Sequence, residues 1–405
     1  MVNVAVLGFG VVGSGVVEVI EKNSSSIGMR AGKDIKVKKV LDIREFPDSP
    51  YKDLITSNAD DIFMDDTIDV VVETIGGAKI AYELTKRALQ LGKNVVTSNK
   101  ELVATHGPEL LKLASENKVN YMFEASVGGG IPIIRPLRQC LAANEIEQIT
   151  GILNGTTNYI LTQMKREGKD FQTALKEAQQ NGYAEADPTA DIEGFDAMYK
   201  LSILSSICFH SRVSIENVYR EGITGVTAED IAYGKEFGFS IKLLAIGKKK
   251  GDRIEARVHP TFIPANHPLA SVRDSYNAVF VKGNAVGDLM LYGKGAGDLP
   301  TGSSVVSDII TACHRLKGHG NVVLDAGDGE VSFEKNWESE FFIRLTVKDK
   351  PGVLAQIAGV FGKYEVSIAS VIQKYRSGDI APLIFVTHHA KELSVKKALE
   401  DLKKE

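Results

Sequence analysis

The segment from residue 185 to residue 200 holds more charge than packing alone requires. It reads EADPTADIEGFDAMYK, with five carboxylates and one lysine, and the apolar run Leu201–Phe209 follows it. This pattern predicts a helix that enters a hydrophobic core with its polar end at a cleft. Asp196 and Lys200 are four residues apart, so they would share one face of that helix. The carboxylate could hold a substrate ammonium group and the amine could deliver a proton. Alternatively, the two form an exposed ion pair worth under about 1 kcal/mol.

A glycine-rich turn near the N-terminus predicts a dinucleotide site. The strand-like run Val2–Leu7 leads directly into the turn, and an amphipathic helix then continues to about Lys22. The first glycine permits the turn, the second lets the backbone approach a pyrophosphate, and the third allows close helix–strand packing. The pyrophosphate would lie on the N-terminus of the helix. The candidate cofactor residues here are Gly8, Phe9, Gly10, Val11, Val12 and Gly13.

The end of the second predicted strand bears on the choice of cofactor. Ile35–Leu41 is followed by Asp42, and Arg44 comes two residues later. An acid at this position usually binds the ribose 2′-hydroxyl of NAD, whereas a nearby arginine accommodates the extra phosphate of NADP. The two signals conflict, so both cofactors stay open, with a slight preference for NADP through Arg44.

The first 135 residues alternate strands and helices. Further strands are predicted at Val70–Glu73, Asn94–Thr97 and Asn120–Phe123, with a helix near Lys79–Leu91. This rhythm predicts an α/β fold with a doubly wound Rossmann-type sheet, whose ligands lie beyond the carboxyl ends of the strands. Thr74 and Lys100 stand in loops at those ends and are candidate cofactor contacts. Lys100 could instead be a surface lysine that begins the next helix, although a lysine ending a buried strand usually has a partner.

Three later segments could contribute to a site, and the first two of them also admit a purely structural interpretation. The segment from Glu124 to Pro132 contains three glycines and one carboxylate, which could cage a monovalent cation or form a plain turn. Residues 154–158 (NGTTN), which include the candidate substrate residue Thr156, could donate hydrogen bonds to a carboxylate or form a turn and a helix cap. The segment from Gly293 to Thr301 opens an apolar helix, Val305–Leu316, and could return the chain to the cofactor.

In this order, these segments closely resemble the homoserine dehydrogenase family. The resemblance covers about residues 1–317. It rests on Gly8–Gly13, Asn99-Lys100, Glu124–Pro132, Asn154–Asn158, Gly182, Glu185–Lys200 and Gly295–Thr301. The acidic segment and the loop around Lys100 are specific to that family and are not general features of nucleotide-binding folds.

The resemblance implies roles for individual residues. Lys200 would be the proton donor, and Lys100 a second active-site lysine that contacts cofactor and substrate. Glu185 and Asp196 would bind homoserine, with Asp191 nearby, while Gly182 and Gly297 would touch the cofactor. A sodium-type ion would be held by Glu124 together with the carbonyl groups of Val127, Gly129 and Ile131. The basic residue that the family usually carries just past the second strand is replaced or shifted here (Asp42-Ile43-Arg44).

The last 66 residues, 340–405, predict a small regulatory domain. A strand at Phe341–Lys348, a helix to about Lys363, strands near Val366–Gln373 and Ile380–His388, and a charged helix from Ser394 give the order βαββα. This order resembles an ACT domain, a ferredoxin-like module that binds amino-acid effectors and favours dimers. Its usual last strand is missing from the pattern, and threonine is the effector we expect.

Composition limits the class of protein. The 405 residues carry a net charge of −4 and an ordinary apolar fraction of 43%, which predict neither nucleic-acid nor membrane binding. Three widely spaced cysteines and the absence of a signal-peptide pattern predict a cytoplasmic protein. We expect a nucleotide-binding domain at 1–135, with 301–317 returning to it. An α+β substrate and dimerisation domain at 136–316 and a loop-rich linker at 317–339 would follow.

These observations predict an enzyme that interconverts L-aspartate 4-semialdehyde and L-homoserine with NADP or NAD, as a homodimer or homotetramer. Two alternatives remain. A semialdehyde dehydrogenase of the same pathway would need a cysteine nucleophile with a partnered base. A non-catalytic sensor would bind a nucleotide and an amino acid, but it leaves both lysines and the acidic cluster unexplained.

Overall fold

The computed structural model describes residues 1–314, 331–373 and 379–404, and the chain divides into two compact units, Met1–Ser332 and Phe333–Glu405. Six parallel strands form the first sheet of the larger unit, in the order β3-β2-β1-β4-β5-β6. In chain order they are β1 Val2–Leu7, β2 Ile35–Leu41, β3 Ile55–Thr56, β4 Val70–Glu73, β5 Asn94–Thr97 and β6 Tyr121–Met122. This strand order confirms the predicted doubly wound fold. The order reverses between β1 and β4, so the ligand crevice is expected beyond the carboxyl ends of those two strands.

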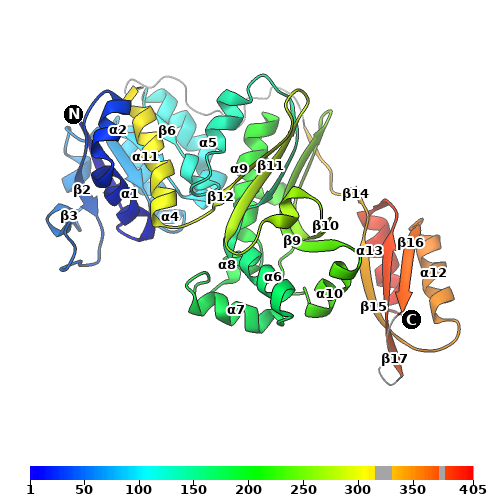
Figure 1. Cartoon of the computed structure of the whole chain (residues 1–405). Coiled ribbons are helices and arrows are strands. Elements are labelled where there is room, and N and C mark those ends of the chain that lie inside the picture. Colours follow the sequence, from blue (N-terminus) through cyan, green and yellow to red (C-terminus); the bar gives the residue numbers. More distant parts are fainter. Residues whose placement is uncertain (315–330, 374–378, 405) are drawn as a thin grey trace. The chain divides into compact units, whose positions relative to one another are not determined.

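Helices cover this sheet, and one of them comes from late in the chain. The early helices are α1 Val11–Lys22, α2 Ser24–Ala31, α3 Asp60–Phe63, α4 Lys79–Gln90 and α5 Lys100–Glu116. Helix α11, Asp298–His314, lies beside α1 (Figure 1). A Cβ on Gly15 would lie 2.3 Å from the Asp298 carbonyl oxygen, so only glycine permits this approach. The helix begins at Asp298, earlier than the predicted Val305, because Pro300 in the first turn forfeits no intrahelical hydrogen bond.

A second, mixed sheet occupies the middle of the chain. Its strands run β12-β11-β7-β9-β10 with antiparallel neighbours, and the short β8 lies parallel to β10. The bounds are β7 Ile146–Ile152, β8 Tyr219–Arg220, β9 Phe239–Lys250, β10 Arg253–Pro264, β11 Tyr276–Gly283 and β12 Gly287–Lys294. The helices are α6 Gly155–Glu167, α7 Phe171–Gln180, α8 Thr189–Ile192, α9 Phe195–Phe209 and α10 Ala228–Glu236. Helix α9 is buried on all sides and packs against β7, β9, β10 and α5, as the predicted core-entering helix should.

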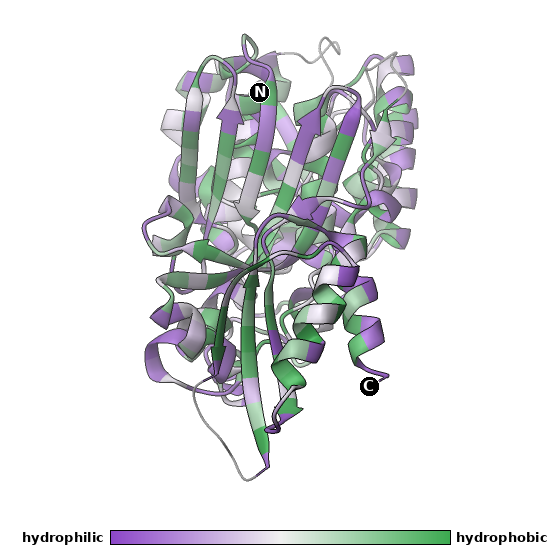
Figure 2. Ribbon diagram, turned by 90° about the vertical axis from the view of Figure 1, so that its right-hand side faces the viewer, coloured by the Kyte–Doolittle hydropathy of each residue, from purple (hydrophilic) through white to green (hydrophobic). Residues whose placement is uncertain are grey.

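The smaller unit has the predicted βαββα order. Strands β15 (Phe342–Lys348), β17 (Ile380–Thr387) and β16 (Ile368–Gln373) form an antiparallel sheet in that order, with helices α12 (Val353–Lys363) and α13 (Glu392–Leu402). Figure 2 shows α13, which ends at the labelled C-terminus, with hydrophobic and hydrophilic residues alternating along it. Its buried residues Val395 and Ala398 join Phe361 and Phe385 in the core of this unit. Short strands β14 (Glu338–Ser339) and β18 (Ala390–Lys391) pair with each other.

Part of the predicted linker 317–339 lies outside the described residues. The glycines that suggested a loop, at positions 318, 320, 327 and 329, all fall there. Residues 331–339 contain β13 (Ser332–Phe333) and β14. Across the described ranges, every helix is too short or too polar to cross a bilayer.

Candidate active site

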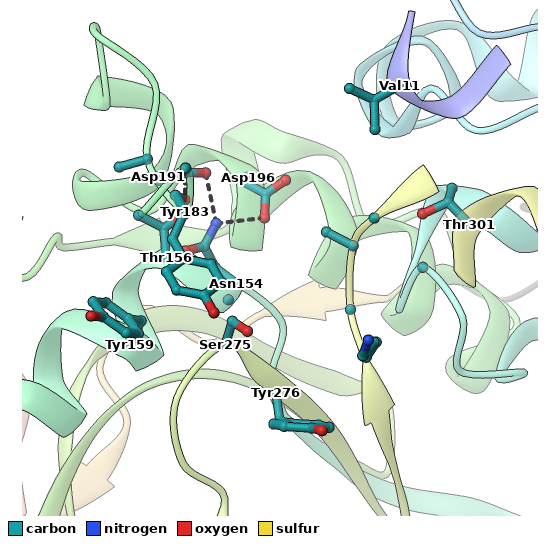
Figure 3. A pocket seen from close by; sticks show the side chains of 18 of the residues that line it. Val11, Asn154, Thr156, Tyr159, Tyr183, Asp191, Asp196, Ser275, Tyr276 and Thr301 are labelled. Carbon is teal, nitrogen blue, oxygen red and sulfur yellow. Dashed lines mark hydrogen bonds between the residues drawn. The ribbon is translucent and has the colours of Figure 1, made fainter. Parts of the chain in front are cut away.

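A cleft of about 1290 Å³ lies in the larger unit and is lined by residues from α1, α5, α6, α9, α11 and several loops. Eleven of the predicted site residues line it: Val11, Val12, Lys100, Gly129, Thr156, Gly182, Glu185, Asp191, Asp196, Lys200 and Gly297. The other predicted residues lie outside this lining: Gly8, Phe9, Gly10, Gly13, Arg44, Thr74, Glu124, Val127 and Ile131. The cleft therefore unites segments that are far apart in the sequence, with the start of α1 on one side and the acidic segment on the other (Figure 3).

Asp196 lies between two lysines at the buried end of α9. Its Oδ2 is 2.7 Å from the Nζ of Lys200, one helical turn away, and its Oδ1 is 3.0 Å from the Nζ of Lys100. Lys200 also donates a hydrogen bond of 2.8 Å to the Leu153 carbonyl oxygen. Asp196 and Lys200 are 5% and 9% exposed. The spacing argument for a shared face is therefore confirmed, and the alternative of an exposed surface pair does not fit this burial.

The electrostatics of this cluster favour charged side chains. Burial by itself raises the pKa of Asp196, but the ammonium groups of Lys200 and Lys100 and a hydrogen bond from Asn154 outweigh it and hold that pKa well below its usual range. The Asp196 carboxylate in turn raises the pKa of Lys100. Lys100 is the first residue of α5, where the helix dipole disfavours a cation. Asp196 offsets that cost and keeps Lys100 charged.

The contacts of Asp196 add to its expected role. Both of its oxygens face lysine ammonium groups, so in this structure the carboxylate positions the two lysines. Its contact with the substrate ammonium group stays a prediction. Two further carboxylates, Asp191 and Glu185, also line the cleft.

Asn154 links two of the carboxylates and also caps a helix. Its Nδ2 donates hydrogen bonds to Asp191 Oδ1 (2.7 Å) and Asp196 Oδ2 (2.9 Å), which Figure 3 draws as dashed lines. Its Oδ1 accepts the Thr157 N–H at 2.8 Å and so caps α6. Thr156 donates to Asp191 Oδ2 at 2.8 Å. Both interpretations of the NGTTN segment are therefore correct, and the carboxylates that it contacts belong to the protein.

Asp191 differs from Asp196 in its balance of charge. Burial and the nearby charge of Asp196 raise the pKa of Asp191, although hydrogen bonds from Thr156 and Asn154 oppose the shift. A cation placed beside Asp191 would therefore stabilise its ionised form. The ammonium group of a bound amino acid would be such a cation.

The glycine turn, which leads into α1 beside the other end of the cleft, is formed by backbone. Gly8 has a φ of +95°, and a Cβ on Gly13 would lie 1.9 Å from the Gly8 carbonyl oxygen. The first turn of α1 has no side-chain cap on its N–H groups, which suits the pyrophosphate of a dinucleotide. The Thr74 hydroxyl donates to the carbonyl oxygens of Leu7 (2.9 Å) and Gly8 (3.0 Å), so it supports the turn. The residues present thus fit a dinucleotide cofactor.

Asp42 and Arg44 form a pair beside the glycine turn. Asp42 accepts the Phe9 N–H at 2.7 Å, and Arg44 donates from Nε and Nη2 at 3.0 and 2.9 Å. The hydrogen bonds from Arg44 and Phe9 hold the pKa of Asp42 well below its usual range, despite its burial. Arg44 also lies over the Phe46 ring, 5.1 Å from its centroid, and its side chain is 59% exposed. The acid that should bind a ribose hydroxyl is therefore neutralised by the arginine.

The Glu124 carboxylate accepts three peptide N–H groups, those of Ile133, Ile134 and Arg135, at 2.7–2.8 Å. These hydrogen bonds hold it at the start of the following helical turns. Its expected role in holding a monovalent cation stays a prediction. Of the expected carbonyl ligands, that of Gly129 also accepts the Ser304 hydroxyl at 2.6 Å.

Several residues that line the cleft were not identified from the sequence, among them Tyr183, Ser275 and Tyr276, which are labelled in Figure 3. Tyr183 packs against Tyr159 with ring centroids 4.6 Å apart, and Ser275 and Tyr276 lie at the start of β11. Tyr183 follows Gly182 and could have been found through that neighbour. Ser275 and Tyr276 have no motif around them, because only the packing of their turn against α6 brings them to the cleft.

A fold that binds a dinucleotide at one end of a cleft and surrounds a buried carboxylate with two lysines at the other defines an NAD(P)-dependent oxidoreductase. Family models agree with this class. Residues 8–124 match "Homoserine dehydrogenase, NAD binding domain", residues 132–310 match "Homoserine dehydrogenase", and residues 341–405 match "ACT domain".

Relatives and solved structures point to the same family. The homoserine dehydrogenases of Bacillus subtilis and Corynebacterium glutamicum are 40% and 42% identical, over 99% of this chain and 94% and 92% of theirs. The crystal structure of a homoserine dehydrogenase from Thiobacillus denitrificans matches with a TM-score of 0.93 and 41% identity, over 100% of this chain and 95% of that one. A hyperthermophilic archaeal homoserine dehydrogenase in complex with NADPH matches at 0.66 and 30%, over 78% of this chain and 98% of that one. The chain belongs to the homoserine dehydrogenase family.

Proposed function

We propose that this protein catalyses the reversible NAD(P)H-dependent reduction of L-aspartate 4-semialdehyde to L-homoserine. The observation that carries the proposal is the cluster in which Asp196 holds Lys200 and Lys100 at the end of the cleft away from α1. A bound nicotinamide cofactor supplies the hydride that reduces the aldehyde carbon. The chain's own residues must then bind the amino acid and manage one proton.

Lys200 is the residue placed to give that proton. An ammonium group has three N–H donors, and among the described residues two of them are directed to Asp196 and the Leu153 carbonyl oxygen. The third is available to the aldehyde oxygen of the substrate. As negative charge develops on that oxygen, Lys200 transfers its proton and remains as an amine between its two acceptors. Lys100, kept charged by Asp196, stabilises the same developing charge.

We propose that Glu185 and Asp196 bind the substrate ammonium group, with Asp191 beside them. Asp191 is partly buried, and desolvation and the nearby Asp196 raise its pKa, so a substrate cation would relieve an unfavourable charge there. Glu185 lines the cleft from the loop before α8 and is exposed. Together with Thr156, these residues would fix the amino acid so that its aldehyde oxygen faces the two lysines.

For the cofactor, we propose that both dinucleotides bind and that NADP is preferred. Arg44 neutralises Asp42 and still has N–H groups beyond the two that it donates to that carboxylate. Those groups would contact the 2′-phosphate, while Gly182 and Gly297 would approach the cofactor from the other walls of the cleft. A monovalent cation, expected to be sodium, would be held by main-chain carbonyls of Val127, Gly129 and Ile131, with Glu124 in a supporting position.

The remaining assignments concern the domains and the oligomeric state. We propose that residues 1–135 and helix α11 form the nucleotide-binding domain, that 136–316 bind the substrate, and that 340–405 bind an amino-acid effector such as threonine. A homodimer or homotetramer in the cytoplasm is the expected assembly. Tyr292, which stacks on Tyr276 and is 52% exposed on the edge strand β12, offers an aromatic surface to a second copy.

The structure argues against the rival in which a cysteine attacks a semialdehyde. Burial raises the pKa of Cys208 far above its usual value and that of Cys313 to about 11, so both thiols stay protonated. All three cysteines lie outside the lining of the cleft.

One assay tests the proposal. The full chain is mixed with L-homoserine and either NADP⁺ or NAD⁺, with and without threonine, and reduced cofactor is followed by absorbance. We expect turnover with both cofactors, faster with NADP⁺, and a lower rate with threonine. If neither cofactor is reduced by homoserine, and NADPH is not oxidised by the semialdehyde, the proposed activity is wrong.

A further inference from the structure

Lys242 is a buried lysine for which the proposed reaction has no use. It lies on β9, is 5% exposed, and belongs to a strand whose neighbouring residues are apolar core. Its Nζ donates a hydrogen bond of 2.8 Å to Asn158 Oδ1 and a second hydrogen bond to the Val272 carbonyl oxygen. A buried amine is unfavourable unless such partners are present. Both partners connect Lys242 to the turn that carries Asp274 and Tyr276, two residues that line the cleft.

Asn158 transmits this contact to a turn that lines the cleft. It lies on α6, one helical turn beyond Asn154, and is 1% exposed. Its Nδ2 donates hydrogen bonds to the carbonyl oxygens of Asp274 (2.9 Å) and Tyr276 (3.1 Å). Residues 272–276 are called the wall turn below. Asn158 belongs to the NGTTN segment, but neither catalysis nor substrate binding accounts for it.

Thr162, a further turn along α6, completes the attachment of the wall turn. Its hydroxyl donates to the Asn158 carbonyl oxygen at 2.6 Å and accepts the Asp274 N–H at 3.1 Å. Lys242, Asn158 and Thr162 are all buried, so the wall turn is fixed from beneath by three polar side chains.

The wall turn needs this support. Asp274 has a φ of +52°, a left-handed conformation that costs an L-residue about 1 kcal/mol or more. The Ser275 carbonyl oxygen would lie 2.8 Å from a Cβ on Gly155, so the turn presses closely against the first residue of α6. Such strained backbone persists only where its surroundings hold it.

The wall turn faces the substrate end of the cleft. Asp274, Ser275 and Tyr276 line the cleft, and Figure 3 shows Ser275 just below Asn154 and Tyr183. Ser275 therefore stands across from the side chain that organises Asp191 and Asp196. A shift of this turn would widen the space for the amino acid but would leave α1 and the glycine turn where they are.

We infer that Lys242 is a positioning residue, which acts through Asn158 and the Val272 carbonyl to hold the wall turn close to α6 and so limits the substrate to a short amino acid. The inference rests on the proposed function, because it concerns the substrate of that same site. Lys242 touches neither substrate nor cofactor. It sets the width of the cleft where the substrate chain lies.

The test replaces Lys242 with methionine, which keeps a long unbranched chain and removes the donors. We expect the KM for L-homoserine to rise about tenfold or more, the scale for losing a hydrogen bond to a charged group. The kcat and the Kd for NADPH should change by less than about threefold, because the lysine cluster and α1 are untouched. Activity on 2-amino-5-hydroxypentanoate, which has one more methylene, should rise relative to homoserine.

Controls separate the possible outcomes. Lys250→Met, at the exposed end of the same strand, should leave all these values as in the wild type. Thr162→Val, which loses the acceptor of the Asp274 N–H, should shift KM and the chain-length ratio in the same direction by a smaller factor, and it serves if Lys242→Met does not fold. An unchanged KM and chain-length ratio in a folded variant would overturn the inference. An inactive wild type would instead refute the proposed function.

Discussion

The two ends of the cleft are built by different means. Beside the end at α1 lies the glycine turn, which is formed by main chain: Gly8 has a left-handed φ, Gly13 leaves no room for a Cβ, and the helix presents uncapped N–H groups. The end at α9 is formed by side chains, in which Asp196 binds two lysines and Asn154 binds two carboxylates. We therefore expect shape to control cofactor binding and charge to control the reaction. Each end should fail in a different way when it is altered.

Removal of the Lys200 amine should have the largest effect. In Lys200→Met we expect kcat to fall by about 10²-fold or more, because the group that protonates the developing alkoxide is lost. The Kd for NADPH should stay within about twofold, since α1 is unaffected. Stopped-flow turnover and cofactor fluorescence measure the two quantities. Full activity in this variant would remove Lys200 from the reaction.

Two substitutions in the glycine turn distinguish its steric requirement from its contact with the cofactor. Gly13→Ala places a methyl group 1.9 Å from the Gly8 carbonyl oxygen, so we expect a loss of stability of about 2–4 kcal/mol, typical of severe overpacking. Gly10→Ala meets nothing closer than Arg44 at 3.9 Å, so its stability should stay near wild type while NADPH affinity falls. Urea unfolding and cofactor titration distinguish them. Equal stability of the two variants would contradict this account of the turn.

Glu73 tests whether the stability of the domain that carries the glycine turn depends on the charge of a buried carboxyl group. It is fully buried at the end of β4, accepts the Thr97 hydroxyl and the Ile75 N–H at 2.6 Å, and burial raises its pKa to about 7. The folded state then binds more protons than the unfolded state between about pH 4.5 and 7, so stability falls as pH rises through that window. The loss would amount to about 3 kcal/mol.

In Glu73→Gln the part of this pH dependence that Glu73 contributes should disappear. Asp308, whose pKa burial also raises to about 7, contributes equally to both proteins, so the difference between them isolates Glu73. Urea denaturation at several pH values measures it. Parallel curves for the two proteins would mean that Glu73 stays ionised in the folded state.

The smallest effect is expected at Arg44. This side chain beside the glycine turn would use its charge to distinguish NADP⁺ from NAD⁺. Arg44→Ala should raise the KM for NADP⁺ by about tenfold, the scale of one charge-assisted hydrogen bond to phosphate. The KM for NAD⁺ should fall or stay constant, because Asp42 is released to bind the ribose. Initial rates with each cofactor decide the matter. An equal change in the KM for NADP⁺ and for NAD⁺ would show that Arg44 does not contact the 2′-phosphate.

The sequence was sufficient where a residue's role depends on its near neighbours. The turn from Gly8 to Gly13, the strands around it and the face shared by Asp196 and Lys200 all follow from local periodicity and spacing, because strand and helix geometry fix which side chains lie together. The family could likewise be named from motifs that are each short and continuous.

The tertiary structure decided which partner each side chain actually has. The spacing pairs Asp196 with Lys200, but only the fold brings Lys100, from a separate helix, to its other oxygen. The Glu124 carboxylate is used by peptide N–H groups, and Ser275 reaches the cleft through a turn that carries no motif. Hydrogen bonds and ion pairs are chosen among all groups that the fold brings within about 3 Å. That competition involves residues remote in the chain, so spacing within any one segment cannot reveal it.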